Sequence, residues 1–427
     1  MVRAVKKPLG LLTLSAATYF MVSGGPYGLE NLIAKTGYGT AALIIVLVPI
    51  LWSLPTALMV GELSAALPED GGYYAWTRRA LGPFWGFQEA WLSLAAAVFD
   101  MGIYPSLLVA YLAKLYPVFD DPVVSFGARA VVLASAVLVN LRGARAVGRS
   151  AEAVGLLLLA PFGVFTVIAV ARPHAVVPHP PTHDWLGGIV VAMWNTMGWD
   201  NASTIAGEVS EPQRTYPRAL GITLVLVVVG YLIPIGAAWW AGIDTAMLTT
   251  GGWASAGQFT AGNVLRYAIV AGGIASAFAA LTSLLMSYSR VVVALAKDRY
   301  LPIGLAPKTT GEVPRGAILA AGGLFSLSLA LDFERLVVLD IVLYGASLAI
   351  EFVALVKLRV SEPELARPFR VPGGVVAAAL LGVFPIGLIL LAFARSSDDR
   401  IGGVNAAWVA LGIVALGPIA YLWRKNR

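Results

Sequence analysis

The chain has 427 residues, of which 58% are hydrophobic and only 13% are charged, and its formal charge is +6. Soluble domains carry roughly twice that share of charged residues, so the composition excludes an ordinary soluble protein. Apolar runs of about twenty residues recur along the chain, and a run of that length crosses a hydrocarbon core of about 30 Å. The composition therefore predicts one membrane domain over residues 1–427.

Several functional classes are excluded by what the sequence lacks. There is no cysteine, which excludes disulfides and thiolate metal sites. There is also no P-loop, nucleophile elbow or HExxH motif, so nothing supports ATP-driven transport or an enzyme. The positive charges lie in short loops between apolar runs, where they act as topology determinants rather than as a nucleic-acid surface. We expect no cofactor, no metal and no nucleic-acid partner.

Twelve transmembrane helices are predicted from the apolar runs. The first run follows a basic segment but lacks a small-residue cleavage site, so we expect a retained helix. The third and eighth helices exceed one span and are expected to tilt or project from the bilayer. The predicted helices cover residues 9–35, 40–66, 83–116, 125–141, 150–171, 185–206, 217–242, 262–296, 314–331, 334–357, 372–394 and 402–424.

The orientation follows from the loop charges. Most of the 30 lysines and arginines fall on the side that holds the N-terminus, with Arg78, Arg79, Arg142 and Arg145 among them. Because positive residues accumulate in cytoplasmic loops, both termini are predicted to be cytoplasmic in the cell (inner) membrane. An even number of spans agrees with this.

Two predicted helices are interrupted at matching places. The first contains SGGPYG at residues 23–28, and the sixth contains WNTMGWDN at residues 194–201. Proline lacks an N–H group and glycine is a weak helix former. Within a bilayer a broken backbone must face protein or water. Breaks five helices apart are typical of inverted repeats, which hold a solute near the membrane midplane. The alternative is a pair of kinks that only assist packing.

Three acids lie deep in the predicted spans, where an ionisable residue is a functional candidate by default. They are Glu30, Asp100 and Asp200, and no lysine or arginine lies at comparable depth in the same helices. Acids without basic partners indicate a bound cation: an ammonium group, a metal ion or a proton. The alternative is that one or two are protonated and hydrogen-bonded to a neighbouring hydroxyl.

The break in the first helix also offers backbone N–H groups at Gly25, Tyr27 and Gly28 to a carboxylate, so an amino acid stays open as substrate. Aromatic residues nearby are candidates for cation–π contacts. The candidate substrate-binding residues are Ser23, Gly24, Gly25, Tyr27, Gly28, Glu30, Asp100, Tyr104, Trp194, Asn195, Trp199 and Asp200.

Other polar residues have competing interpretations. Thr282 and Ser283 could coordinate Na⁺, although hydroxyls bonded to the preceding helical turn are commoner. Glu30 is a further candidate for the coupling ion. Glu62 and Glu208 favour a structural ion pair or a cytoplasmic latch, and Asp340 and Glu351 receive no role. His174, His179 and His183 lie in a Pro-rich loop, which is more typical of a solvated segment than of a metal site.

Four segments carry a resemblance to a known family. GGPYGLEN at residues 24–31, the run at residues 61–87, Asp100-x-x-x-Tyr104-Pro105 and the run at residues 199–220 resemble the amino acid–polyamine–organocation superfamily. Within it they look most like the polyamine and L-type amino acid permeases. The stretch at residues 278–283 also resembles the sodium-site segment of the bacterial leucine transporter.

The resemblance implies the inverted five-plus-five fold of the leucine transporter, with repeats at residues 9–171 and 185–357 and two accessory helices at 372–424. It implies alternating access, with the solute at the two breaks. We therefore predict a secondary transporter of a polyamine or cationic amino acid that is coupled to H⁺, with Na⁺ as the alternative coupling ion. Ala110 stands where plant members carry a second acid, so a neutral amino acid permease or exchanger stays open. A channel or membrane sensor is a more distant alternative, and the oligomeric state is not predicted.

Overall fold

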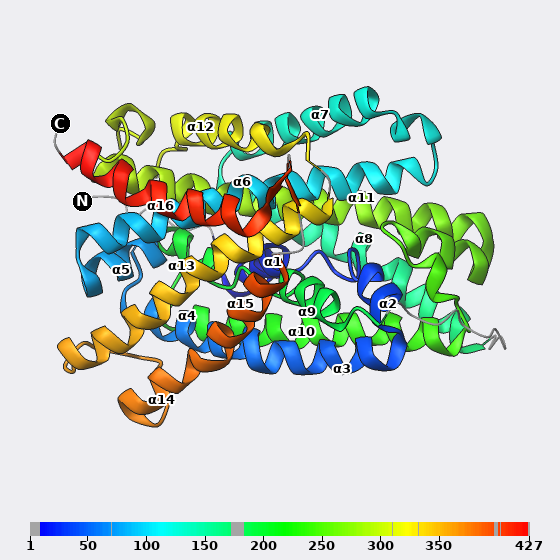
Figure 1. Ribbon diagram of the computed structural model, residues 1–427, viewed down its shortest axis with the longest axis horizontal. Helices are drawn as coiled ribbons and strands as arrows, with labels where there is room; N and C mark the ends of the chain where they lie inside the picture. Colours follow the sequence, from blue (N-terminus) through cyan, green and yellow to red (C-terminus); the bar gives the residue numbers. More distant parts are fainter. Residues whose placement is uncertain are drawn as a thin grey trace.

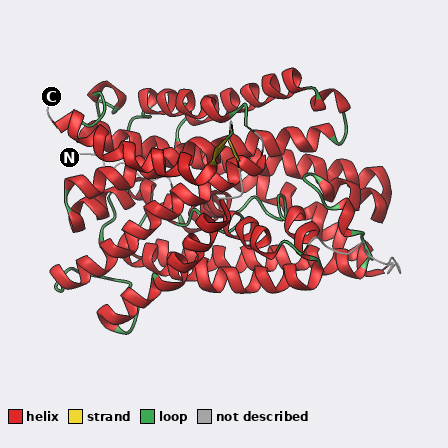
Figure 2. Ribbon diagram, in the orientation of Figure 1, coloured by secondary structure: helices red, strands yellow, loops and turns green. Residues whose placement is uncertain are grey.

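The computed structural model describes residues 9–69, 71–171, 183–309, 311–331, 333–396, 400–401 and 403–425. Figure 2 shows that almost all of this chain is helical. The helices are α1 Leu11–Val22, α2 Glu30–Thr36, α3 Tyr38–Val48, α4 Leu54–Ala66, α5 Tyr73–Leu81, α6 Pro83–Ala113, α7 Pro122–Asn140, α8 Ala144–Ala171, α9 Trp185–Trp194, α10 Pro212–Trp240, α11 Gly252–Lys297, α12 Arg315–Phe325, α13 Phe333–Ser361, α14 Gly374–Leu381, α15 Val383–Ser396 and α16 Ala406–Lys425. A short antiparallel hairpin joins β1 Arg400–Ile401 to β2 Val404–Asn405.

Within the described residues, eight helical segments are long and apolar enough to cross a membrane. Four shorter apolar helices, α1, α9, part of α8 and the α12 region, stand where further spans are predicted. The long helices run roughly along the long axis of the molecule (Figure 1). The protein is therefore an all-α, multi-pass membrane protein, and the count of twelve spans stays a prediction.

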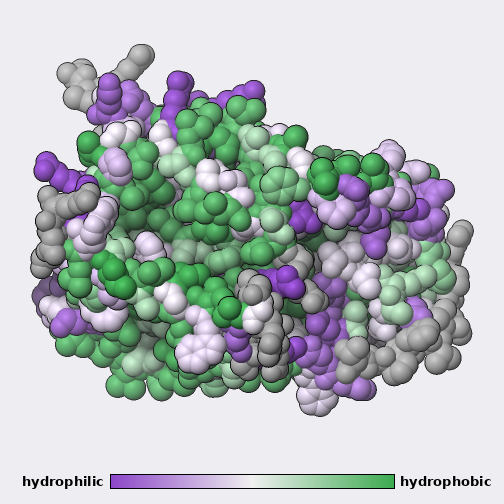
Figure 3. All heavy atoms as spheres, turned by 45° about the horizontal axis from the view of Figure 1, so that its top comes forward, coloured by the Kyte–Doolittle hydropathy of each residue, from purple (hydrophilic) through white to green (hydrophobic). Residues whose placement is uncertain are grey.

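The helices differ in how deeply they lie in the bundle. Within the apolar windows of α6, α11 and α13, 72%, 78% and 72% of residues are buried, against 17% for α7 and 22% for both the α14–α15 segment and α16. The first three therefore form the centre and the others its outside. Figure 3 shows a broad apolar surface with hydrophilic residues gathered along its margins, as expected for a surface that faces lipid.

Three features were not predicted from the apolar runs. Helix α5 lies in the predicted loop between the second and third spans and is bounded by Gly72 and Gly82, both with positive φ. Helix α11 starts ten residues early, but it is kinked at Ala261 and Gly262, where the predicted span begins. The β1–β2 hairpin precedes α16. Helix α5, the part of α11 before its kink and the hairpin are each short and not strongly apolar, so hydropathy does not predict them.

Candidate functional site

Both predicted interruptions are present. Between α1 and α2 the backbone leaves the helical path at Ser23, and Gly25 and Gly28 have φ values of 72° and 92°. Between α9 and the 3-10 segment Asp200–Glu208, Gly198 has a φ of 87°. Positive φ is readily accessible only to glycine, so these glycines permit the chain to turn where the helices stop. The prediction of two broken helices is confirmed.

The two breaks lie against each other. A Cβ atom on Gly198 would stand 2.6 Å from the Met21 carbonyl oxygen, and a Cβ on Gly28 would stand 2.9 Å from the Trp194 ring. Side chains at both positions would therefore separate the segments.

Tyr231, on α10, connects the two breaks. Its hydroxyl lies 2.5 Å from the Ser23 hydroxyl and donates to the Asn195 carbonyl at 2.6 Å. The sequence gives no signal for this role, because a tyrosine in an apolar helix is usually a packing residue.

We expect Tyr231→Phe to weaken solute binding by about tenfold without unfolding the protein. The ring and its packing are kept, while one hydroxyl that holds the breaks together is lost, and a net hydrogen bond contributes about 1 kcal/mol. Solute affinity and thermal unfolding of the purified variant check this. An unchanged affinity would show that the bridge does not set the geometry of the breaks.

Asp100 and Asp200 face the break region from two elements. Asp200 is 1% exposed and accepts a hydrogen bond from Tyr344 of α13 at 2.5 Å, while the same hydroxyl accepts from the Gly198 N–H group at 3.0 Å. Asp100, on α6, is 2% exposed and accepts from Tyr288 at 3.3 Å, and its second oxygen has no partner. Among the described residues neither acid forms an ion pair, and the tyrosine hydroxyls that bond to them are neutral.

Glu30 has a different environment. It is fully buried, and its oxygens accept from the Gly28 N–H at 2.7 Å, from Tyr111 at 2.6 Å and from the Gly251 N–H at 2.9 Å. Its carboxylate therefore ties the start of α2 to α6 and to the loop before α11. Its predicted role in substrate or coupling-ion binding stays a prediction.

The hydrogen-bond donors of the first break are largely occupied. The Gly25 N–H donates to the Ser23 hydroxyl at 2.9 Å, and the Gly28 N–H donates to Glu30. Gly24 accepts a hydrogen bond from Ser276 through its carbonyl. Two of the three N–H groups that could recognise a carboxylate are therefore already bonded within the protein.

The predicted aromatic residues divide into two groups. Trp194 lies edge-on to Phe333, with ring centroids 5.4 Å apart, and 6.3 Å from the Tyr104 ring. These rings lie beside Gly28 and could contact a cation. Trp199 is fully buried and donates to the Thr196 carbonyl, and Tyr27 donates to the Ile269 carbonyl. Their polar groups are bonded to backbone.

The two hydroxyls of the possible sodium site differ. Thr282 donates to the Ala279 carbonyl in the preceding turn at 3.0 Å, the commoner arrangement. The Ser283 hydroxyl and the Thr18 hydroxyl of α1 are buried without a partner. No group of three metal-ligating side chains occurs in the part of the chain that the structure describes. His174 and His179 lie outside the described residues.

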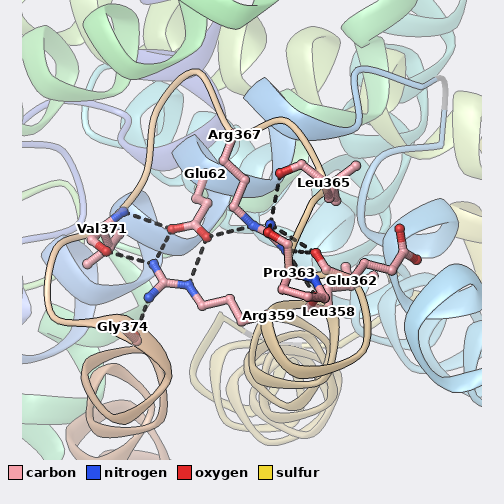
Figure 4. A network of polar contacts seen from close by, with 9 residues as sticks. All are labelled: Glu62, Leu358, Arg359, Glu362, Pro363, Leu365, Arg367, Val371 and Gly374. Atoms are coloured by element: carbon pink, nitrogen blue, oxygen red, sulfur yellow. Dashed lines mark hydrogen bonds and ion pairs between the residues drawn. The ribbon is translucent and has the colours of Figure 1, made fainter.

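Glu62 and Glu208 each form an ion pair with arginine. Glu62 of α4 contacts Arg359 of α13 and Arg367, with both arginines almost fully buried (Figure 4). Glu208 pairs with Arg290 of α11 at 2.7 Å. The predicted ion pairs of both glutamates are confirmed, and their action as a latch stays a prediction.

Comparison with known proteins agrees with this architecture. A family model described as amino acid permease matches residues 11–416. The chain is 33% identical over 416 residues to "Polyamine transporter PUT1" of Oryza sativa subsp. japonica, covering 96% of this chain and 77% of that protein. It is 31% identical to "Polyamine transporter RMV1" of Arabidopsis thaliana, covering 96% and 84%. It is 25% identical to "Uncharacterized transporter Rv1999c" of Mycobacterium tuberculosis, covering 99% and 93%. The chain belongs to the amino acid permease family of the amino acid–polyamine–organocation superfamily.

Proposed function

We propose that this permease transports a polyamine by alternating access and that Asp100 and Asp200 bind its ammonium groups. The observation that carries the proposal is that two buried carboxyl groups near the helix breaks bond to neutral tyrosine hydroxyls and form no ion pair among the described residues. A buried carboxylate without a counter-charge is costly, and a bound ammonium removes that cost. The names of the plant relatives agree with an amine as solute.

A neutral amino acid is less well supported. Its carboxylate needs free donors, and the N–H groups of Gly25 and Gly28 are already bonded. It also carries no net positive charge to offset two buried acids. The exchanger alternative therefore requires the first break to rearrange before binding.

The proposal also includes the membrane topology of the chain and its two inverted repeats. Twelve spans with cytoplasmic termini place Glu62 and Glu208 near the cytoplasmic surface. Inverted repeats over residues 9–171 and 185–357 place α1 and α9 as the paired broken helices. The ion pairs of Glu62 and Glu208 then close the cytoplasmic side, and the contact of Lys35 with Asp184 at 3.2 Å lies on the opposite side.

Coupling to H⁺ is our preferred mechanism, since several acids could carry a proton and α11 has no acidic side chain to offer Na⁺. A sodium site would use Thr18 and Ser283, whose hydroxyls have no hydrogen-bond partner among the described residues.

Uptake of radiolabelled spermidine into proteoliposomes tests the function. We expect accumulation driven by an inward proton gradient and none driven by a sodium gradient alone. Accumulation with sodium alone that is lost in Ser283→Ala would contradict the coupling. Uptake that depends only on internal solute would identify an exchanger.

A further inference from the structure

A second set of acids lies along the contact between α6 and α13. On α13, Asp340, Tyr344, Ser347 and Glu351 are spaced by four, three and four residues, which places them on one helix face. On α6, Glu89, Ser93 and Asp100 form a similar stripe. The acids of each helix are therefore three turns apart on the same face.

Hydrogen bonds show that the two stripes face each other. The hydroxyls of Ser93 and Ser347 lie 2.9 Å apart, and both bond to Glu89, at 2.7 and 3.4 Å. Because Glu351 follows Ser347 by one turn and Glu89 precedes Ser93 by one turn, both side chains lie on the faces that meet in this contact.

The other two acids meet further along the same contact. Ser93 lies against Ser347, and Gly102 of α6 lies against Leu336 of α13, so the two helices run in opposite directions. Asp100 follows Ser93 by seven residues and Asp340 precedes Ser347 by seven, which places these two acids opposite each other. Glu89 thus pairs with Glu351 and Asp100 with Asp340, as in antiparallel helices. Three turns of helix separate the two pairs by about 16 Å along the axis.

Three acids of this contact have carboxyl oxygens without a hydrogen-bond partner among the described residues. Glu89, Asp340 and Glu351 are all fully buried. Both oxygens of Asp340, both of Glu351 and one of Glu89 have no hydrogen-bond partner. Among the described residues none of them forms an ion pair. A ligand that brings positive charge and N–H donors into the contact would satisfy these oxygens.

We propose that Glu89 and Glu351, with Ser93 and Ser347, form a second ammonium site, so that the substrate is a long linear polyamine. One amine would bind at Asp100 and Asp200 and another at Glu89 and Glu351, with the methylene chain between α6 and α13. This assignment rests on the proposed function. A diamine with a four-carbon spacer is too short to reach both pairs, whereas a tetraamine extends much further.

Equilibrium binding of spermine and putrescine to the purified full-length protein tests this. Glu89→Gln and Glu351→Gln keep the shape of each side chain and remove its charge. We expect each to weaken spermine binding by at least tenfold while putrescine binding changes by less than threefold. The matched control is Asp200→Asn, which should weaken binding of both amines. Thermal unfolding of each variant monitors folding.

Several outcomes would overturn the inference. Equal losses of spermine and putrescine affinity in the glutamine variants would assign Glu89 and Glu351 a structural role. Unchanged spermine binding would show that these two residues do not contact the substrate. If a glutamine variant does not fold, Ser347→Ala keeps the charges and removes one hydroxyl, and it must still weaken spermine more than putrescine. If the unaltered protein binds neither amine, the proposed function itself is wrong. If the unaltered protein binds both amines and the variants keep the ratio of spermine affinity to putrescine affinity, only the second site is wrong.

Discussion

Asp200→Asn is expected to reduce binding of spermidine by at least a hundredfold while the protein stays folded. The asparagine oxygen can still accept the hydrogen bond from Tyr344, so the local structure is kept. What is lost is the negative charge, and a buried ammonium without a counter-charge carries a desolvation cost of several kcal/mol. A hundredfold loss corresponds to about 2.7 kcal/mol.

The control for this variant is Tyr344→Phe, which removes the hydrogen-bond donor of Asp200 and keeps its charge. We expect it to bind spermidine within about tenfold of the unaltered protein, since one hydrogen bond contributes about 1 kcal/mol. Both variants are compared by equilibrium binding after thermal unfolding has shown that they are folded. Normal binding by Asp200→Asn would make Asp200 structural and place the cation elsewhere.

Glu62→Gln is expected to have the largest effect on stability. Glu62 and Arg359 are fully shielded from solvent, and Arg367 is 4% exposed. The Glu62 carboxylate accepts from the guanidinium of Arg359 at 2.9 Å and from the Val371 N–H at 2.8 Å (Figure 4). Removing the charge leaves two buried arginines with no acid between them, which typically costs about 3–5 kcal/mol.

An exposed acid of the same region is the matched control. Glu362 bonds to Arg79 at the surface, and these hydrogen bonds hold the pKa of Glu362 below its ordinary value, so the residue is charged at neutral pH. Surface pairs contribute at most about 1 kcal/mol, so Glu362→Gln should unfold close to the unaltered protein. Thermal unfolding in one detergent compares the two variants. Equal unfolding temperatures would mean that the buried network does not stabilise the fold.

The sequence predicted the features that depend on local chemistry. Glycine and proline at residues 23–28 and glycine at residue 198 marked the breaks, and long apolar runs marked most helices. The sequence indicates that Glu62 and Glu208 form ion pairs, because buried acids near basic loops need partners. The partner Arg359 lies 297 residues away, and only the tertiary fold identifies it.

The sequence could not rank the three acids. Glu30, Asp100 and Asp200 look equivalent in the chain, and the difference lies in the donors that folding brings to each. The donors of Glu30 include Tyr111 and Gly251, which are 81 and 221 residues distant. Gly25 illustrates the same limit, because a Cβ atom there would stand 2.8 Å from Leu158 of α8 rather than in open space.

The sequence alone reveals only some of the acids that meet between α6 and α13. In the sequence alone Asp340 and Glu351 have no evident role, and Glu89 lies near the start of its helix, where single acids are often solvated. Their equal spacing indicates a shared site only once α6 and α13 are seen to pack face to face through Ser93 and Ser347. Pairing between distant helices is a tertiary property that hydropathy does not encode.

The central claim is that the broken helices recognise a cationic amine, and equilibrium binding of radiolabelled spermidine to the purified protein tests it most directly. We predict saturable binding that is displaced by unlabelled spermine and is not displaced by leucine at the same concentration. Displacement by leucine, together with direct binding of labelled leucine that survives Asp200→Asn, would contradict the account and identify a neutral amino acid as the substrate.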